Sequence, residues 1–258
     1  MKRSRISYVD YSAGDLGFVL GCTPISAGCR ECYARRLFER FGRDFSKVTV
    51  YPEKLERLRT RSFPQDGNVR GPHTKPLLFP VDLGDLFHPA VPAEFITYSF
   101  EVMGSRQDVD WIVLTKRPER MVDVLFGEEG GWFLGGGDYE ANIILGVTAE
   151  DQENLDRRWP ILRDAWMGPT MLSIEPCLGP VSLAPHLRDD LRRPSWVIVG
   201  AESGPNRRPF DVAWAEVLYR ECRAADIPFF FKQGSALRPG QDEDLPGIGK
   251  VKEWPSGN

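Results

Sequence analysis

The chain has 258 residues, of which 41% are hydrophobic and 27% are charged, with a formal net charge of −4 at neutral pH. These values are typical of one globular α/β domain, and they argue against a protein whose whole surface binds nucleic acid. No apolar run approaches the ~20 residues of a membrane span, and the polar start at 1–7 lacks the apolar core of a secretory signal. We therefore expect a single domain over 1–258, in the cytoplasm and without a membrane partner.

The first predicted element is a buried strand at 17–20, which leads into a segment that holds Cys22, Cys29 and Cys32. Six residues separate the first two of these cysteines, and two residues separate the last two. We call residues 21–32 the cysteine loop. Structural zinc needs four ligands, and no second cysteine pair or histidine pair at zinc-ligand spacing follows. A four-iron cluster held by only three cysteines would instead leave one iron open. Three crowded thiols among five cysteines also argue against a disulfide framework.

The rest of the chain alternates between helical and strand patterns. Predicted helices lie at 32–41, 52–59, 93–103, 118–125, 148–166 and 211–225, and predicted strands at 75–81, 110–114, 142–147, 170–174, 196–200 and 228–231. Thr148 is the predicted N-cap of its helix, Cys177 and Cys222 are expected as buried small residues, and 234–258 reads as a C-terminal extension. Repeated β/α units predict a parallel sheet covered by helices, and we expect a partial or near-complete TIM-type barrel.

Polar residues follow nearly every predicted strand, and in a parallel barrel these strand ends form one active-site face. Each residue alone could instead cap a turn or a helix, so a structural role stays open for most of them. Glu175 and Lys232 are favoured as functional, because each ends an apolar strand and would need a partner if buried. The whole set is Asp82, Asp85, Lys116, Arg117, Glu150, Glu175, Glu202 and Lys232.

Two further stretches each leave two interpretations open. Residues 30–61 carry ten Lys or Arg against five acidic residues, which predicts either contact with a phosphate backbone or a solvated helix face. The glycine-rich stretch 127–137 predicts either a lid over the site or a surface insertion.

The cysteine loop resembles the cluster loop of the radical S-adenosylmethionine (SAM) superfamily, in which three cysteines hold a [4Fe-4S] cluster and SAM chelates the fourth iron. The first spacing is longer than the commonest one, and Glu31 precedes Cys32, with the aromatic Tyr33 after it. Seven blocks in order resemble a family of radical-SAM-like proteins from phages, prophages and bacteria that is distantly similar to spore photoproduct lyase. The blocks are 21–34, 84–87, 114–118, 145–152, 173–176, 200–204 and 229–233.

This resemblance implies a partial barrel with the cluster loop after the first strand, and an enzyme that cleaves SAM to a 5′-deoxyadenosyl radical. It also implies a one-electron donor such as flavodoxin or ferredoxin. The expected site residues are the cluster ligands Cys22, Cys29 and Cys32; the SAM-contacting Tyr33, Gly84, Asp85, Arg117, Thr148, Glu202 and Ser203; and Glu175, Lys232 and Lys116 for substrate binding or proton transfer.

For the substrate, the resemblance favours a nucleic-acid base or modified nucleotide, such as an amino-acid-decorated thymine that is isomerised during phage DNA hypermodification. Two alternatives stay open. The same cluster could act on a peptide or a small metabolite, or the protein could be a non-enzymatic, metal-binding nucleic-acid-binding protein.

Overall fold

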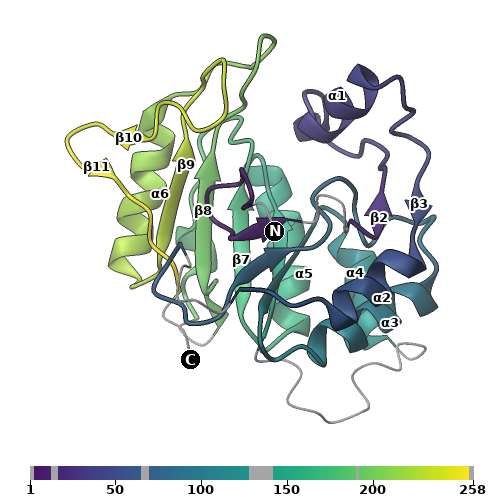
Figure 1. Ribbon diagram of the computed structural model, residues 1–258. Coiled ribbons are helices and arrows are strands. Elements are labelled where there is room, and N and C mark those ends of the chain that lie inside the picture. The colour runs from purple at the N-terminus through teal and green to yellow at the C-terminus, as the bar shows by residue number, and fades with distance from the viewer. Residues whose placement is uncertain (1–2, 13–16, 65–69, 128–141, 190–191, 256–258) are drawn as a thin grey trace.

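The computed structural model describes residues 3–12, 17–64, 70–127, 142–189 and 192–255. Seven parallel strands form a sheet that curls into a half-barrel (Figure 1). In pairing order they are β1 (Tyr11–Ser12), β4 (Leu77–Phe79), β5 (Asp110–Thr115), β6 (Ile143–Thr148), β7 (Thr170–Ile174), β8 (Trp196–Gly200) and β9 (Phe229–Gln233). Each strand pairs with the next sheet strand along the chain, so the sheet winds in one direction, as in a barrel, rather than reversing as in a doubly wound fold. The expected α/β class with a partial parallel barrel is confirmed.

Helices cover the convex face of the sheet, and their apolar sides share one large core with the strands. They are α2 (Pro52–Thr60), α3 (Ala93–Gly104), α4 (Pro118–Phe126), α5 (Gln152–Ala165) and α6 (Val212–Ala224). Strands β7 and β8 are buried along their whole length, as continuous apolar runs covered on both faces should be. None of the helices in the described part of the chain is both long and apolar enough to span a membrane.

The concave face of the half-barrel is filled by the N-terminal segment, which lies in front of the sheet in Figure 1. Tyr8 packs edge-on against Trp196 and Phe230, with ring centroids 6.0 Å apart in both pairs. Trp254, near the other end of the chain, packs against the same Phe230 at 5.0 Å. Both ends of the described chain therefore pack into the concave face, which is a second apolar core and not an open channel.

The strand that leads into the cysteine loop, β2 (Val19–Leu20), lies outside the half-barrel. It pairs antiparallel with β3 (Thr49–Val50), and the sheet begins instead with β1. The strand predicted at 17–20 is therefore not a strand of the half-barrel, although the cysteine loop does follow β1, the first strand of the sheet, and precedes β4. The apolar run predicted a strand correctly, but periodicity carries no information about which strand will be its partner.

One helix start also differs from its prediction. Thr148 is the last residue of β6, where it pairs with Ser173, and α5 starts after Asp151. The Asp151 carboxylate accepts a hydrogen bond from the Asn154 backbone N–H at 2.9 Å, which makes Asp151 the N-cap. Pairing with β7 extends β6 by one residue, to Thr148, and α5 therefore begins later in the chain than predicted. The other predicted elements agree with the structure to within a few residues at their ends.

The C-terminal extension closes the outer edge of the sheet. It forms a small hairpin of β10 (Asp244–Leu245) and β11 (Gly249–Lys250), and then Lys252 forms an antiparallel bridge with Phe230 of β9. The Phe231 N–H donates to the Val251 carbonyl at 2.9 Å in the same place. The extension thereby covers a strand edge that would otherwise present unpaired backbone groups.

Candidate functional site

The cysteine loop stands over the carboxyl ends of the strands and continues into α1 (Tyr33–Arg40), which lies above the sheet in Figure 1. Its first turn needs glycine: Gly21 has φ of +92°, and a Cβ there would lie 2.6 Å from the Lys47 carbonyl oxygen. Gly21 also forms a parallel bridge with Gly84, the glycine after β4 that was predicted as a SAM contact. The loop is therefore joined to a strand end of the half-barrel by backbone contacts.

The three thiols of the loop are free and half-buried. Cys22 and Cys32 pack beside a small apolar cluster of Ala34, Phe38 and Phe45, which fixes the base of the loop. Burial, and then the nearby Asp85 carboxylate, raise the pKa of Cys22 to about 11.

In the described part of the chain, no three His, Cys, Asp or Glu side chains are close enough to hold a single metal ion. A zinc-type site is therefore not formed by these residues. A cubane cluster makes a different demand, because each cysteine binds a different iron and the sulfurs stand further apart than the ligands of one ion. Three free thiols on one loop, once deprotonated, are the soft donor set that such a cluster takes. The chemistry of the donor set therefore fits a cluster.

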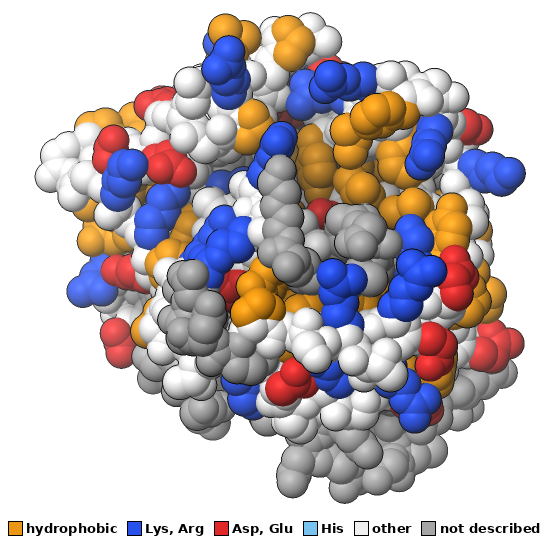
Figure 2. All heavy atoms as spheres, viewed as in Figure 1, with side chains coloured by type: hydrophobic (Ala, Val, Ile, Leu, Met, Phe, Trp, Pro, Cys, Tyr) orange, Lys and Arg blue, Asp and Glu red, His pale blue; other side chains and the backbone are white. Residues whose placement is uncertain are grey.

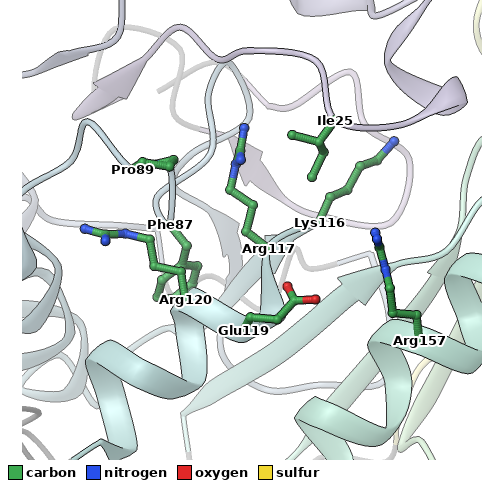
Figure 3. Close-up of a pocket in the computed structure, with 8 residues that line it drawn as sticks. All are labelled: Ile25, Phe87, Pro89, Lys116, Arg117, Glu119, Arg120 and Arg157. Carbon is green, nitrogen blue, oxygen red and sulfur yellow. The ribbon is translucent and has the colours of Figure 1, made fainter.

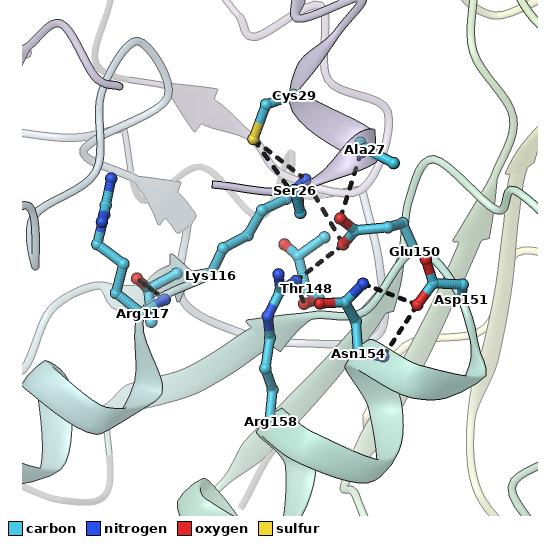
Figure 4. A network of polar contacts seen from close by, with 12 residues as sticks. Ser26, Ala27, Cys29, Lys116, Arg117, Thr148, Glu150, Asp151, Asn154 and Arg158 are labelled. Atoms are coloured by element: carbon cyan, nitrogen blue, oxygen red, sulfur yellow. Dashed lines mark hydrogen bonds and ion pairs between the residues drawn. The ribbon is translucent and has the colours of Figure 1, made fainter. Parts of the chain in front are cut away.

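Cys29 lies at the top of a charged network that reaches down into the core (Figure 4). Lys116 Nζ, from the end of β5, lies 4.0 Å from the Cys29 sulfur and 3.7 Å from Glu150 Oε2. Glu150 is fully buried after β6, and Arg158 Nη1 of α5 donates to it at 2.8 Å. Burial disfavours both the Cys29 thiolate and the Glu150 carboxylate. Lys116 and several hydrogen bonds, including one from Ser26, together outweigh burial, and the pKa of each group is lowered. The network thus favours a thiolate at Cys29.

Gly28 allows the loop to sit directly on this network. Its N–H donates to Glu150 Oε1 at 3.3 Å. A Cβ at this position would lie 2.7 Å from Lys116 Nζ and 3.0 Å from Glu150 Cδ. The glycine before Cys29 is therefore a close-approach position.

A second ion pair lies next to Cys22. Arg117 Nε is 3.6 Å from Asp85 Oδ2, and Arg117 Nη2 donates to the Thr23 carbonyl at 3.0 Å. Asp85 also accepts from the Thr115 hydroxyl at 2.8 Å, and burial raises the pKa of Asp85. The structure thus brings together Asp85 and Arg117, two residues predicted separately, and ties both to the cysteine loop.

The loop and α1 also reach across to the end of β8. Arg36 of α1 donates to the Ser203 carbonyl at 2.9 Å. Arg208, which is ion-paired with Glu202, donates to the Ala27 carbonyl at 3.1 Å. Two predicted site residues, Glu202 and Ser203, therefore hold the loop at its far side.

A third group of polar side chains faces the concave side of the half-barrel. Lys232 at the end of β9 is ion-paired with Glu175 after β7, and its Nζ lies 5.6 Å from the ring centroid of Tyr8. Burial, then Glu175 and Asp82, raise the pKa of Tyr8. The hydroxyl of Tyr33 donates to the Asp82 carbonyl, which links the start of α1 to this group. Glu175 and Lys232 are half-buried, and each is the charged partner of the other.

Sequence reasoning missed Arg158, Arg208 and Tyr8. Arg158 is a single arginine inside a helical pattern, Arg208 lies in a loop, and Tyr8 precedes the first recognised element, so none had a motif. The cysteines other than the loop three, Cys177 and Cys222, are buried, as expected. Thr148 is also buried, with its carbonyl accepting from Arg158 at 2.6 Å. The predicted lid at 127–137 lies outside the described residues from 128 onward.

A family model described as a protein of unknown function, DUF5131, matches residues 3–245. No curated protein and no solved structure matches the chain. The functional argument therefore depends on the residues of this chain.

Proposed function

Because the chain belongs to the DUF5131 family, whose function is unknown, its activity has to be inferred from its own residues, and we propose that it is a radical SAM enzyme. The observation that carries this proposal is the position of the cysteine loop. Three free thiols are held over the carboxyl ends of a parallel half-barrel by contacts to the ends of β4, β5, β6 and β8. In β/α barrels this is the face on which reactants meet.

Cys22, Cys29 and Cys32 would hold a [4Fe-4S] cluster. When bound, the cluster and SAM would supply a 5′-deoxyadenosyl radical that abstracts a hydrogen atom from the substrate, after reduction by a donor such as flavodoxin or ferredoxin. Lys116 supports a negative charge on Cys29, because its ammonium lies 4.0 Å from the sulfur. The network beneath the loop would therefore favour the thiolate form that iron binds.

The Asp85–Arg117 pair suits the amino-acid end of SAM. An α-amino group and an α-carboxylate carry opposite charges on adjacent positions, and the pair presents opposite charges in the same way. Arg117 would orient the carboxylate, and Asp85 would accept a hydrogen bond from the amino group. Gly84, Thr148, Glu202 and Ser203 lie at or after strand ends and Tyr33 begins α1, and we assign these five residues to the rest of the cofactor.

We propose a nucleic-acid base or modified nucleotide as the substrate, with isomerisation of an amino-acid-decorated thymine as the specific reaction. The support is the polar group on the concave face. Glu175 and Lys232 form a second pair of opposite charges that could orient an amino-acid substituent, and the buried ring of Tyr8 lies against Lys232. In this arrangement Lys232 or Glu175 would position the substituent or move a proton on it.

The first test is iron and sulfide content with low-temperature electron paramagnetic resonance, on protein reconstituted without oxygen, before and after adding SAM. We expect about four irons per chain and a reduced-cluster signal that changes with SAM. Cys29→Ala should abolish the signal, whereas Cys177→Ala, which removes a cysteine outside the loop, should retain it. One zinc per chain, or a cluster indifferent to SAM, would favour the non-enzymatic alternative.

The second test measures release of 5′-deoxyadenosine from the reduced protein with different additions. Stimulation by DNA or nucleotides, and not by peptides, is the expected result. The opposite pattern would favour the peptide or small-metabolite alternative. Arg35 and Arg36 are poor choices for testing the basic stretch, because both donate to backbone carbonyls that hold the loop.

A further inference from the structure

A cavity of about 290 Å³ opens under the outer side of the cysteine loop, where the loop passes over the ends of α4 and α5 (Figure 3). Figure 3 shows Arg117 and Arg157 rising on either side of Glu119, with Ile25 of the loop above them. Four cationic side chains line this cavity, namely Lys116, Arg117, Arg120 and Arg157, against the single carboxylate of Glu119. Hydrophobic residues complete the wall.

The positive charge of the cavity is only partly neutralised by the protein. Lys116 and Arg117 have carboxylate partners outside the cavity lining, Glu150 at 3.7 Å and Asp85 at 3.6 Å. In the described residues, Arg120 donates to the Val91 carbonyl and Arg157 to the Asn154 side-chain oxygen, which are both uncharged. The cavity wall therefore carries two arginines that are hydrogen-bonded to uncharged groups, against one exposed glutamate.

One of these two arginines also has an unused donor. The Nε atom of Arg120 is buried and has no hydrogen-bond partner in the described residues, whereas Arg117 Nε, which also lacks a hydrogen bond, lies 3.6 Å from Asp85 Oδ2. A buried N–H without a partner costs free energy unless a ligand or water satisfies it. Arginine side chains with unused donors commonly bind phosphate, because two N–H groups of the planar guanidinium can donate to two phosphate oxygens.

The same charge disfavours SAM as the occupant. SAM carries a sulfonium, an ammonium and one carboxylate, so it is a net cation and would be repelled by a cation-rich cavity. A phosphodiester carries one negative charge, which matches the excess of two arginines over one glutamate. The cavity also lies beside the proposed reaction centre, since Lys116 reaches from its wall to within 4.0 Å of the Cys29 sulfur.

We propose that this cavity binds a backbone phosphate of a nucleic-acid strand whose modified nucleotide lies at the carboxyl ends of the strands, beneath the cysteine loop. The proposal rests on the substrate class of the proposed function, but not on its radical chemistry. It assigns Arg120 and Arg157 to phosphate binding and makes the substrate a polymer.

The test is fluorescence anisotropy of a labelled single-stranded oligonucleotide with the full chain, in the absence of SAM, over a range of salt concentrations. Arg157→Gln removes an exposed cation of the cavity and should weaken binding roughly fivefold, with a salt slope lower by ~0.7. Glu119→Gln removes the opposing carboxylate and should strengthen binding. Arg220→Gln on α6, which removes an exposed arginine far from the cavity, should leave binding unchanged.

If Arg157→Gln and Glu119→Gln both behave like Arg220→Gln, the cavity does not bind nucleic acid and the proposal is wrong. The second part of the test measures the binding of thymidine 5′-monophosphate and of inorganic phosphate to the same variants. Weaker binding of the monophosphate to Arg157→Gln, with unchanged binding of the oligonucleotide, would assign the cavity to a free nucleotide and overturn the backbone interpretation. Absence of SAM cleavage together with the expected binding changes would refute the proposed radical chemistry and retain the phosphate site.

Discussion

Replacing Arg158 by methionine probes the buried network that supports the cysteine loop. Arg158 Nη1 donates to the Thr148 carbonyl at 2.6 Å and to Glu150 at 2.8 Å, and both Arg158 and Glu150 are fully buried. Removing one partner of a buried ion pair typically costs about 3–5 kcal/mol. Lys116 remains 3.7 Å from Glu150 in the variant and keeps part of the neutralisation. We therefore expect Arg158→Met to lower the free energy of unfolding by about 3 kcal/mol.

Urea unfolding followed by tryptophan fluorescence measures this loss, and a double-mutant cycle identifies its source. Glu150→Gln removes the carboxylate charge that Arg158→Met leaves without its arginine partner. The double variant should therefore lose less free energy of unfolding than the sum of the two single losses, by about 1–3 kcal/mol. Arg163→Met, a more exposed arginine on the same helix, should stay within about 0.5 kcal/mol of the wild type. A loss below about 1 kcal/mol for Arg158→Met, or strictly additive losses, would refute the reasoning.

Three further predictions concern thiols, glycines and acid stability. In metal-free native protein at pH 8, iodoacetamide should label Cys29 faster than Cys177. Lys116 and hydrogen bonds around Cys29 together outweigh burial and lower the pKa of Cys29, whereas burial raises the pKa of Cys177 to about 11. Equal labelling of the two cysteines in peptide mass spectrometry would contradict this. Gly21→Ala should cost about 1–3 kcal/mol in urea unfolding and more than Gly42→Ala, since both glycines have positive φ but only at Gly21 would a Cβ meet a backbone oxygen, at 2.6 Å. The pKa of Glu150 is lowered on folding, so its charge stabilises the protein above about pH 4.3, and this contribution is lost as the pH falls through the folded pKa. Thermal unfolding should show the difference in melting temperature between wild type and Glu150→Gln narrowing below about pH 5. A difference that stays constant with pH would contradict this.

The order and type of most elements follow from the pattern of amino acids alone. Strands β7 and β8 were predicted with their observed bounds, because continuous apolar runs between turn residues have few other ways to be buried. The sequence also identified the polar strand ends, because reactive groups gather at the carboxyl ends of parallel strands in a β/α repeat. It identified the cysteine loop from the close spacing of Cys22, Cys29 and Cys32.

Tertiary structure alone decided which of these residues meet. The partner of β2 is β3 and not the half-barrel, since strand pairing depends on contacts between segments that are distant in sequence. Arg158 and Tyr8 became part of the site because helix packing and the N-terminal segment bring them beside Glu150 and Lys232. Local patterns fix what each segment can become, whereas the desolvation of charges and the choice of their partners are set only when distant segments pack together.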